Sequence, residues 1–376
     1  MSSCLIIAGE KSGEEHAMSF FPRLKTLCPQ TQFFGVGGEE LKNSGLELLY
    51  HLNDFSTWGY SEVFKKIPFY KEALKNILAE VEKRQCKTAI LVDFQSFNMK
   101  LAKALKEKGV NVLYYVAPQA WAWKEYRVKA LEKNVHTLFT IIPFEKKWFL
   151  ERGVKRVVSI DHPLLTHYEE DLKNTPIVHR ENIQSINLLL LPGSRNFEVK
   201  NLLPIFVEAV TQLRKQYSLK VSIVKSSSVD PKIYSSYDHM FDQTYWNEDL
   251  TKALRSNDIC FAASGTVTLA CALYEIPTIV TYRTSLLNEF IFHTFVPYKG
   301  PISLANIVHQ NSVFPELIQD QVTPFNLVSC FHEWAYNGLS NNNLKNLWAQ
   351  LATTKTLVKG ESVDLPNLMA QVILKD

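Results

Sequence analysis

The sequence predicts two doubly wound α/β domains in tandem. A length of 376 residues exceeds what one hydrophobic core usually supports. Short, fully apolar runs alternate with longer amphipathic stretches, a pattern typical of parallel strands covered by helices on both faces of a sheet. The alternation stops at the polar segment 161–185, which contains two prolines, and then starts again. We therefore expect one α/β domain on each side of this segment.

The expected elements follow from the apolar runs in chain order. Strands are expected at 4–9, 31–36, 88–93, 111–116, 137–142 and 156–160, and in the second half at 186–191, 219–224, 258–263 and 277–282. Helices are expected at 62–84, 97–108, 197–216, 247–256 and 265–274. This predicts an N-terminal domain over 1–165, a linker over 166–185, a C-terminal domain over 186–340, and a helical tail over 341–376 that packs back on the first domain.

Composition excludes several classes of protein. A net charge of +3 is too weakly basic to indicate nucleic-acid binding, although it allows attraction to an anionic surface. The six cysteines include no C-x-x-C pair and no metal-ligand spacing, so we expect free thiols in a reducing compartment. No signal-peptide pattern is present, and no run approaches the ~18 apolar residues of a membrane span. These features predict a cytoplasmic protein.

Two turns in the second half are suited to binding phosphate. Gly193, Ser194 and Arg195 follow the apolar run 186–191 and precede an amphipathic helix, whose N-terminus offers unpaired N–H groups. Ser264, Gly265 and Thr266 stand at a similar strand end. The alternatives are a plain turn with a surface arginine and a helix capped by Ser264. Two such turns in one domain favour a nucleoside diphosphate site.

Three segments of the first half carry candidate catalytic or binding residues. Glu10, with Ser12 and Gly13, lies in a Gly-containing turn that matches no nucleotide motif; a cap made by Ser12 is the alternative. Asp93 ends an apolar strand, where poor solvation would raise its pKa and suit a general base; a helix cap is the alternative. The remaining candidates in this half are Asn98, Gln119 and Trp121, the last of which either packs the core or lines an apolar or sugar pocket.

Taken in order, these motifs resemble the lipid-A-disaccharide synthase family over nearly the whole chain. The family consists of inverting glycosyltransferases with the GT-B fold, in which two Rossmann-like domains face each other across a cleft. The matching segments are 8–15, 35–38, 59–63, 91–98, 116–123, 142–149, 161–165, 190–199, 263–270, 282–283, 303–308 and 315–319. Each segment is weak alone, and the ordered series is specific.

The resemblance implies a reaction and its partners. The family joins UDP-2,3-diacylglucosamine to the 6-hydroxyl of 2,3-diacylglucosamine 1-phosphate, forms the β-1,6 lipid A disaccharide 1-phosphate and releases UDP. It uses no metal or cofactor, and it lies peripherally on the inner face of the inner membrane. Candidate membrane contacts here are 62–71 and 286–300; packing between domains is the alternative for the second. A homodimer is also allowed, since members can be dimers.

The resemblance also implies residue roles. Asp93 falls on the proposed general base, Arg195 on the arginine that neutralises the diphosphate, and Glu10 and Asn306 on positions important for activity. Residues expected to bind substrate are Ser12, Gly13, Asn98, Gln119, Trp121, Gly193, Ser194, Ser264, Gly265, Thr266, Arg283 and Glu316.

The sequence departs from the family at a few positions. Gln95 and Ser96 replace a proline and an acidic residue that are usual there. Ala270 stands where the family tends to carry a glutamate that binds the ribose of UDP, and Glu275 is a candidate substitute. These changes leave two alternatives open. Beside the synthase activity that the resemblance implies, these are another GT-B sugar-nucleotide enzyme, such as a UDP-sugar 2-epimerase or a different glycosyltransferase, and a non-catalytic homologue that binds lipid or nucleotide sugar.

Overall fold

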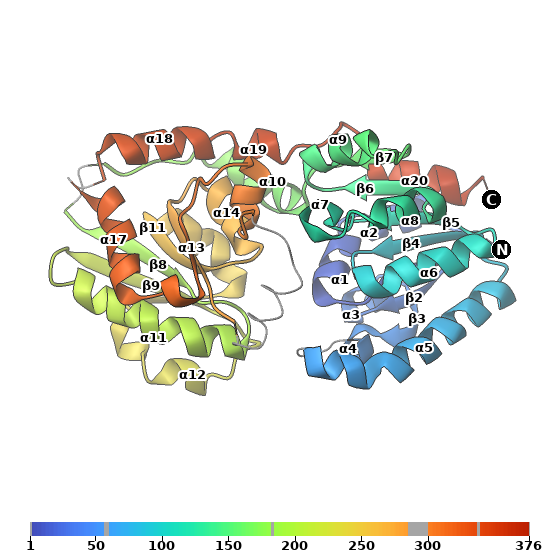
Figure 1. Ribbon diagram of the computed structural model, residues 1–376, viewed down its shortest axis with the longest axis horizontal. Coiled ribbons are helices and arrows are strands. Elements are labelled where there is room, and N and C mark those ends of the chain that lie inside the picture. Colours follow the sequence, from blue (N-terminus) through green and yellow to red (C-terminus); the bar gives the residue numbers. More distant parts are fainter. Residues whose placement is uncertain (1, 56–59, 182–183, 285–299, 337–338, 376) are drawn as a thin grey trace. The chain divides into compact units, whose positions relative to one another are not determined.

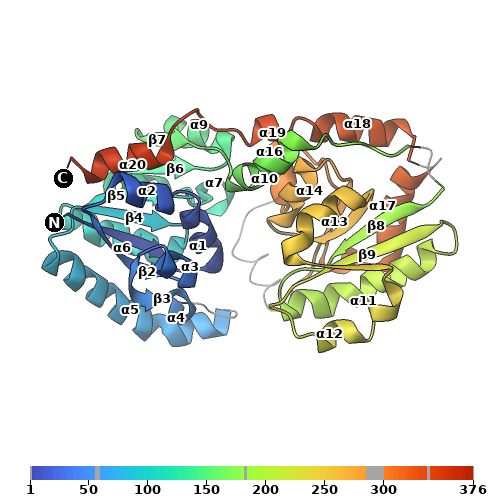
Figure 2. The same ribbon diagram turned by 180° about the vertical axis from the view of Figure 1, so that it is seen from behind.

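The computed structural model describes residues 2–55, 60–181, 184–284, 300–336 and 339–375, with 60–65 and 123 described by their backbone alone. The chain divides into two compact units. Unit 1 comprises Met1–Pro163 and Lys359–Asp376, and unit 2 comprises Leu164–Val358. Each unit contains one parallel sheet with helices on both faces (Figures 1 and 2). Within the described residues, no helix is long and apolar enough to cross a membrane.

Unit 1 is built on a seven-stranded parallel sheet with the order β3-β2-β1-β4-β5-β6-β7. Its strands are β1 (Ser3–Ala8), β2 (Gln32–Gly37), β3 (Glu47–His51), β4 (Thr88–Val92), β5 (Asn111–Tyr115), β6 (Thr137–Thr140) and β7 (Val157–Ser159). Every residue of β1 and β4 is buried, which explains their continuous apolar character. The order of the strands reverses between β1 and β4, and ligands of such sheets bind at the carboxyl ends there.

Two layers of helices cover the sheet of unit 1. They are α1 (Lys11–Met18), α2 (Phe21–Leu27), α3 (Glu39–Asn43), α4 (Leu52–Phe55), α5 (Tyr60–Lys83), α6 (Gln95–Glu107), α7 (Ala120–Trp123), α8 (Arg127–Asn134), α9 (Pro143–Glu151) and α20 (Leu365–Ile373). Helices α5, α6 and α8 bury apolar side chains against one face in a single cluster that includes Leu5, Ile77, Leu101 and Leu131. Helices α1, α2 and α20 lie on the opposite face, as the two views show.

Unit 2 is built on a six-stranded parallel sheet with the order β10-β9-β8-β11-β12-β13. Its strands are β8 (Ile186–Leu191), β9 (Leu219–Lys225), β10 (Gln243–Trp246), β11 (Ile259–Ala263), β12 (Thr278–Tyr282) and β13 (Glu316–Ile318). Its α-helices are α10 (Pro163–Asn174), α11 (Asn196–Leu213), α12 (Lys232–Ser235), α13 (Leu250–Ser256), α14 (Val267–Leu273), α16 (Leu304–His309), α17 (Pro324–Ala335), α18 (Asn342–Leu351) and α19 (Thr354–Leu357). The reversal of strand order lies between β8 and β11.

The segment expected to be a linker, 166–185, is partly helical and belongs to unit 2. Helix α10 continues to Asn174 because its polar residues find partners on that unit. The Asp171 carboxylate accepts hydrogen bonds from Arg255 Nε at 2.8 Å and from the Tyr274 hydroxyl at 2.7 Å. Tyr168 packs edge-on against the Tyr274 ring, with centroids 5.2 Å apart. A polar composition was therefore a poor guide to a linker here.

The expected tail, 341–376, is divided between the two units. Residues up to Val358 belong to unit 2, where α18 buries Leu344, Leu347 and Trp348. Residues from Lys359 belong to unit 1, where α20 packs against α2 and Asp364 forms an ion pair with Arg23. The amide of Gly360 also donates to Asp161 Oδ1 at 2.7 Å. The end of the chain therefore completes the unit in which the chain begins.

Candidate active site

Asp93 follows β4 directly, at the carboxyl end of the strand where the order of sheet 1 reverses. Asp93 and Phe94 have φ angles of 45° and 44°, in the left-handed region that non-glycine residues rarely adopt. Three hydrogen bonds hold this turn: Asp93 N–H donates to Tyr115 O at 2.9 Å, and Asp93 O accepts from the Tyr114 hydroxyl at 3.0 Å and from Asn98 Nδ2 at 2.9 Å. Such strain costs roughly 1–3 kcal/mol per residue and persists where the surroundings impose it, as they often do at functional sites.

The environment of Asp93 raises its pKa. Burial of the carboxylate is the main cause, and the negative charge of Glu10 adds to it; together they raise the pKa of Asp93 from 3.8 to about 6. Glu10 is the residue before α1, and Ala8 and Val92 are paired in the sheet, so both carboxylates follow neighbouring strand ends. A carboxylate with a pKa near 6 is well suited to accept a proton near neutral pH. The alternative that Asp93 caps α6 is wrong, because Phe94 holds the cap position and no side chain caps it.

Two predicted substrate-binding residues instead support the turn. Asn98 is fully buried, and its amide nitrogen donates to Val92 O at 3.2 Å as well as to Asp93 O. Gly13 is buried, and a Cβ there would lie 3.7 Å from Ala8 and Val92 atoms, so it packs α1 on the sheet. Ser12 is exposed inside α1 and does not cap it, since Glu10 precedes the helix. Asn98 and Gly13 therefore support the backbone around Asp93 from the interior of the unit.

The aromatic segment after β5 is mostly packed against the protein. Trp121 Nε1 donates to Glu145 Oε1 at 2.9 Å, and its ring lies edge-on to Phe144 with centroids 5.4 Å apart. Complete burial raises the pKa of Glu145 to about 8. These contacts favour the packing alternative for Trp121 over an open pocket. Gln119 is exposed at the start of α7.

In unit 2, the turn after β8 presents donors that already hold an anionic group. Gly193 has a φ of 108°, and a Cβ there would lie 2.4 Å from Glu198 Oε2. The Glu198 carboxylate accepts from Ser194 N–H at 3.1 Å and from Arg195 Nη1 at 3.1 Å. The Arg195 side chain remains 71% exposed. The turn therefore presents donors of the kind that bind phosphate oxygens, and a bound phosphate would have to compete with Glu198 for them.

The second turn lies at the neighbouring strand end. Leu191 of β8 and Ala262 of β11 are paired, so the residues that follow these strands share one edge of the sheet. Gly265 and Thr266 are exposed, and the space around a Cβ at Gly265 is open. Ser264 does not cap α14 but donates from its hydroxyl to Ile302 O at 3.2 Å. Arg283 is exposed just beyond β12, the next strand along this edge.

Asn306 and Glu316 brace this edge from inside. Asn306 is fully buried, and its amide bonds to Phe314 N, Phe314 O and Glu316 Oε1, each at 2.8 Å. The Glu316 carboxylate also accepts from the N–H groups of Ile302 at 2.9 Å and Ser303 at 2.8 Å. Both residues were expected to act on substrate. Their polar atoms are engaged within the protein, where they hold the loop that receives Ser264, and their action on substrate stays a prediction.

We expect Asn306→Ala to lower the free energy of unfolding by about 3 kcal/mol, because it leaves the backbone N–H and C=O of buried Phe314 without their partner and removes one of the three donors to the Glu316 carboxylate. Urea unfolding measures this change. A catalytic role for the amide itself would instead give an inactive variant of unchanged stability, and that result would contradict the positioning role.

Comparison with known proteins identifies the family. The sequence model of the family described as lipid-A-disaccharide synthetase matches residues 4–371. The chain belongs to the lipid-A-disaccharide synthase family. The lipid-A-disaccharide synthase of Myxococcus xanthus (strain DK1622) is 33% identical over 330 residues, covering 85% of this chain and 84% of that protein. As a member of this family, the chain is a glycosyltransferase of lipid A biosynthesis.

Solved structures confirm the fold prediction. The spinosyn rhamnosyltransferase SpnG is similar with a TM-score of 0.56 at 10% identity, and the similarity covers 100% of both chains. The UDP-GlcNAc 2-epimerase from Neisseria meningitidis is similar with a TM-score of 0.53 at 10% identity, again over 100% of both chains. Since a transferase and an epimerase share this fold, the fold does not choose between them. The match to the lipid-A-disaccharide synthase family does.

Two residues of this synthase-family chain escaped the sequence analysis. Glu198 holds the Gly193–Arg195 turn. It could have been found from the sequence because it lies three residues after Arg195, in the first turn of the expected helix. Trp246 ends β10 and is 46% exposed, beside a cavity of about 330 Å³. An exposed indole at the carboxyl edge of the sheet is suited to stacking on a nucleobase. The sequence feature that could have identified Trp246 is an aromatic residue directly before a polar turn.

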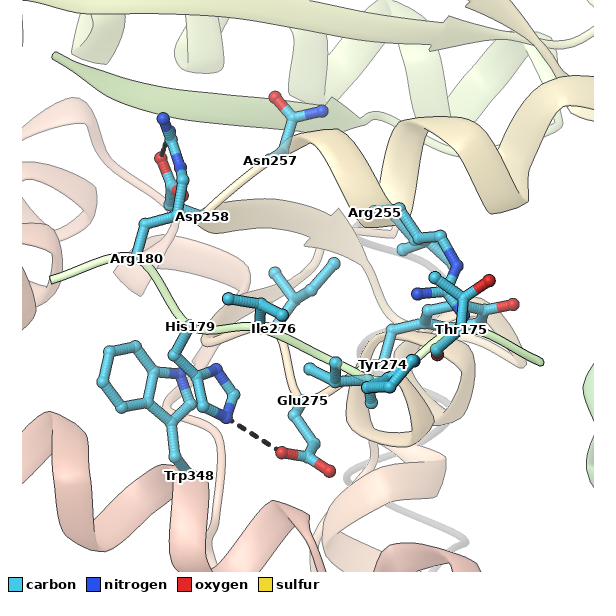
Figure 3. Close-up of a pocket in the computed structure, with 14 residues that line it drawn as sticks. Thr175, His179, Arg180, Arg255, Asn257, Asp258, Tyr274, Glu275, Ile276 and Trp348 are labelled. Carbon is cyan, nitrogen blue, oxygen red and sulfur yellow. Dashed lines mark hydrogen bonds and ion pairs between the residues drawn. The ribbon is translucent and has the colours of Figure 1, made fainter. Parts of the chain in front are cut away.

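A separate pocket of about 230 Å³ lies at the opposite edge of the sheet of unit 2, near the amino ends of β11 and β12 (Figure 3). There the His179 ring stacks on Trp348 with centroids 4.2 Å apart, and His179 Nε2 lies 2.9 Å from Glu275 Oε2. Glu275 is therefore no substitute for a ribose-binding glutamate, since it follows the far end of α14 from the Ser264–Thr266 turn. Ala270 itself is buried.

Proposed function

We propose that this protein joins UDP-2,3-diacylglucosamine and 2,3-diacylglucosamine 1-phosphate into the β-1,6 lipid A disaccharide 1-phosphate and releases UDP. The observation that carries the proposal is the partly buried carboxylate of Asp93, with a pKa of about 6 at the strand-order reversal, in a chain that matches the synthase family over residues 4–371. The family model establishes the reaction class, and Asp93 supplies a base of suitable strength for it.

In this proposal, unit 1 activates the acceptor. The 6-hydroxyl oxygen attacks the anomeric carbon of the donor, the bond from that carbon to the diphosphate oxygen breaks, and the configuration inverts. The hydroxyl proton passes to Asp93. The strained and hydrogen-bonded turn holds the carboxylate in place before substrate binds, so little reorganisation is needed during the reaction.

Unit 2 stabilises the leaving group. As the bond to the sugar breaks, negative charge develops on UDP. The guanidinium of Arg195 and the amide of Ser194 are the donors that we propose for its diphosphate, together with the Ser264–Thr266 turn. Glu198 keeps these donors oriented in the absence of an anion.

The acyl chains of both proposed substrates indicate where the enzyme works. We infer that it lies peripherally on the inner face of the inner membrane. Ile67, which is 41% exposed between Lys66 and Lys71, supports a contact by the described part of segment 62–71. Of segment 286–300, residues 286–299 lie outside the described residues, and the homodimer stays a prediction.

The decisive test is synthesis of the disaccharide. Purified protein should form it, and release UDP, only when both acylated sugars are present, and should do so in EDTA. Conversion of UDP-N-acetylglucosamine without an acceptor would instead indicate an epimerase. Complementation of a synthase-deficient cell by the wild type but not by Asp93→Asn would exclude a non-catalytic binding protein.

We expect Glu10→Gln to move the acidic limb of the pH–rate profile to lower pH. Since the charge of Glu10 raises the pKa of Asp93, its removal lowers that pKa from about 6 toward 3.8, while burial keeps it above 3.8. A base is inactive when protonated, so kcat/KM of the wild type should fall as pH drops through about 6 and that of the variant only at lower pH. An unshifted limb would mean that another group limits the rate.

A further inference from the structure

Unit 1 contains an apolar cavity of about 460 Å³ between α5 and α6, directly beside the proposed catalytic residues. Its lining includes Glu10. Most of the rest is aliphatic or aromatic, and the residues that line it are Glu10, Ile67, Tyr70, Lys71, Leu74, Phe94, Gln95, Ser96, Phe97 and Lys100. A cavity of this size and character is typical of a site for a small apolar ligand.

The aromatic wall of the cavity is held rigidly. The Phe94 ring lies 5.7 Å from Phe97, 5.8 Å from Phe55 and 6.2 Å from Tyr70, measured between centroids. It also rests on Gly9, where a Cβ would approach it to 2.7 Å. Because Phe94 follows Asp93 in the same left-handed turn, the backbone that positions the base also positions the cavity wall.

Charges surround the apolar interior. Lys71 on α5 and Lys100 on α6 are exposed at the lining, and Glu10 is exposed beside Asp93. An apolar interior with a cationic rim fits a ligand that has a hydrocarbon chain and an anionic head group. The proposed acceptor has both, since it carries acyl chains and a phosphate, whereas a simple sugar has no chain to place there.

We propose that this cavity binds one acyl chain of the acceptor sugar, and that Leu74 and Ser96 limit how long a chain it accepts. The proposal rests on the proposed function. Burial of each methylene should improve kcat/KM by about fourfold until the cavity is filled, and additional methylenes should then have little effect.

Bulky substitutions in the lining test the proposal. Leu74→Trp fills the cavity from α5, and Ser96→Phe fills it from an exposed position of α6 that tolerates substitution. Lys75→Trp is the matched control, because Lys75 is exposed on the same helix and does not line the cavity. The readout is the ratio of kcat/KM for tetradecanoyl and butanoyl acceptors with a common donor. We expect this ratio to fall at least roughly tenfold in both lining variants and to be unchanged in the control.

The outcomes separate this proposal from the proposed function. If the wild type forms the disaccharide but all variants keep its chain-length ratio, the cavity does not hold the chain and the proposal is overturned. If the wild type forms no disaccharide, the proposed function fails. Binding of the tetradecanoyl acceptor, measured by titration without donor, then still decides the cavity's role: weaker binding by Leu74→Trp and Ser96→Phe than by Lys75→Trp supports it, and equal binding overturns it.

Discussion

Asp93→Asn should abolish most of the activity and stabilise the fold. Loss of the general base should lower kcat by about 10²–10⁴. Stability should rise because the folded protein no longer contains a partly desolvated carboxylate whose pKa is about 6 instead of 3.8. In the wild type, the folded state disfavours the ionised form of Asp93 and is destabilised by it. This destabilisation is absent below pH 3.8, grows between pH 3.8 and about 6, and is complete above about 6. It amounts to about 3 kcal/mol.

Urea unfolding at pH 4 and pH 8, combined with initial rates, measures both effects. The stability difference between Asp93→Asn and wild type should be small at pH 4 and largest at pH 8. Glu107→Gln is the matched control, since Glu107 is an exposed carboxylate on α6 and its replacement should change neither quantity. An inactive Asp93→Asn that is less stable at pH 8 would show that the carboxylate has a structural role.

The apolar runs of the sequence located the buried strands and the edge strand β7, but β3, β10 and β13 were not among the expected strands. β1, β4 and β11 are wholly buried, so their side chains are apolar on both faces and stand out as continuous runs. β3 has no fully buried residue, and β10 is mostly exposed. A strand that is only partly buried need not be apolar at every position, so neither segment stands out as a continuous apolar run.

Strand ends located the candidate site in the sequence, whereas the hydrogen-bond partners of its side chains could not be predicted. Asp93 and Arg195 follow long apolar strands, and a polar residue at the end of such a strand can be recognised from the sequence alone. The partners of Asn306 are Phe314 and Glu316, and those of Trp121 include Glu145. Such pairs depend on how separate segments pack. A buried amide bonded to the backbone and an exposed amide that binds a substrate therefore look the same in the sequence.

The structure resolves a further ambiguity about the turns. Each of the three proposed caps, by Ser12, Asp93 and Ser264, is wrong, although these residue types are favoured as caps. At the two strand-order reversals, other residues occupy the cap positions of the helices. The side chains of Ser12, Asp93 and Ser264 are therefore not used as caps. Departure from a local preference at such positions is what a functional constraint on the turn would produce.

Arg195→Ala should lower kcat by about 10²–10³ with little change in stability. The guanidinium is exposed and its pair with Glu198 is a surface ion pair, which typically contributes at most about 1 kcal/mol. Its proposed partner, the diphosphate, gains negative charge only as the sugar bond breaks, so the loss should appear in the rate of the chemical step. Arg195→Lys should recover only part of the activity, because an ammonium group cannot make two parallel bonds to phosphate oxygens.

Steady-state kinetics with the UDP-sugar varied, alongside urea unfolding, test this expectation. Arg214→Ala is the matched control, since Arg214 caps the other end of α11 and pairs with Asp242 at 2.8 Å. A variant whose KM rises while kcat is unchanged would mean that Arg195 binds the ground state and the leaving group equally. In that case charge on the departing UDP would have to be stabilised by the Ser194 amide and the Ser264–Thr266 turn. Those backbone donors survive any substitution of the arginine.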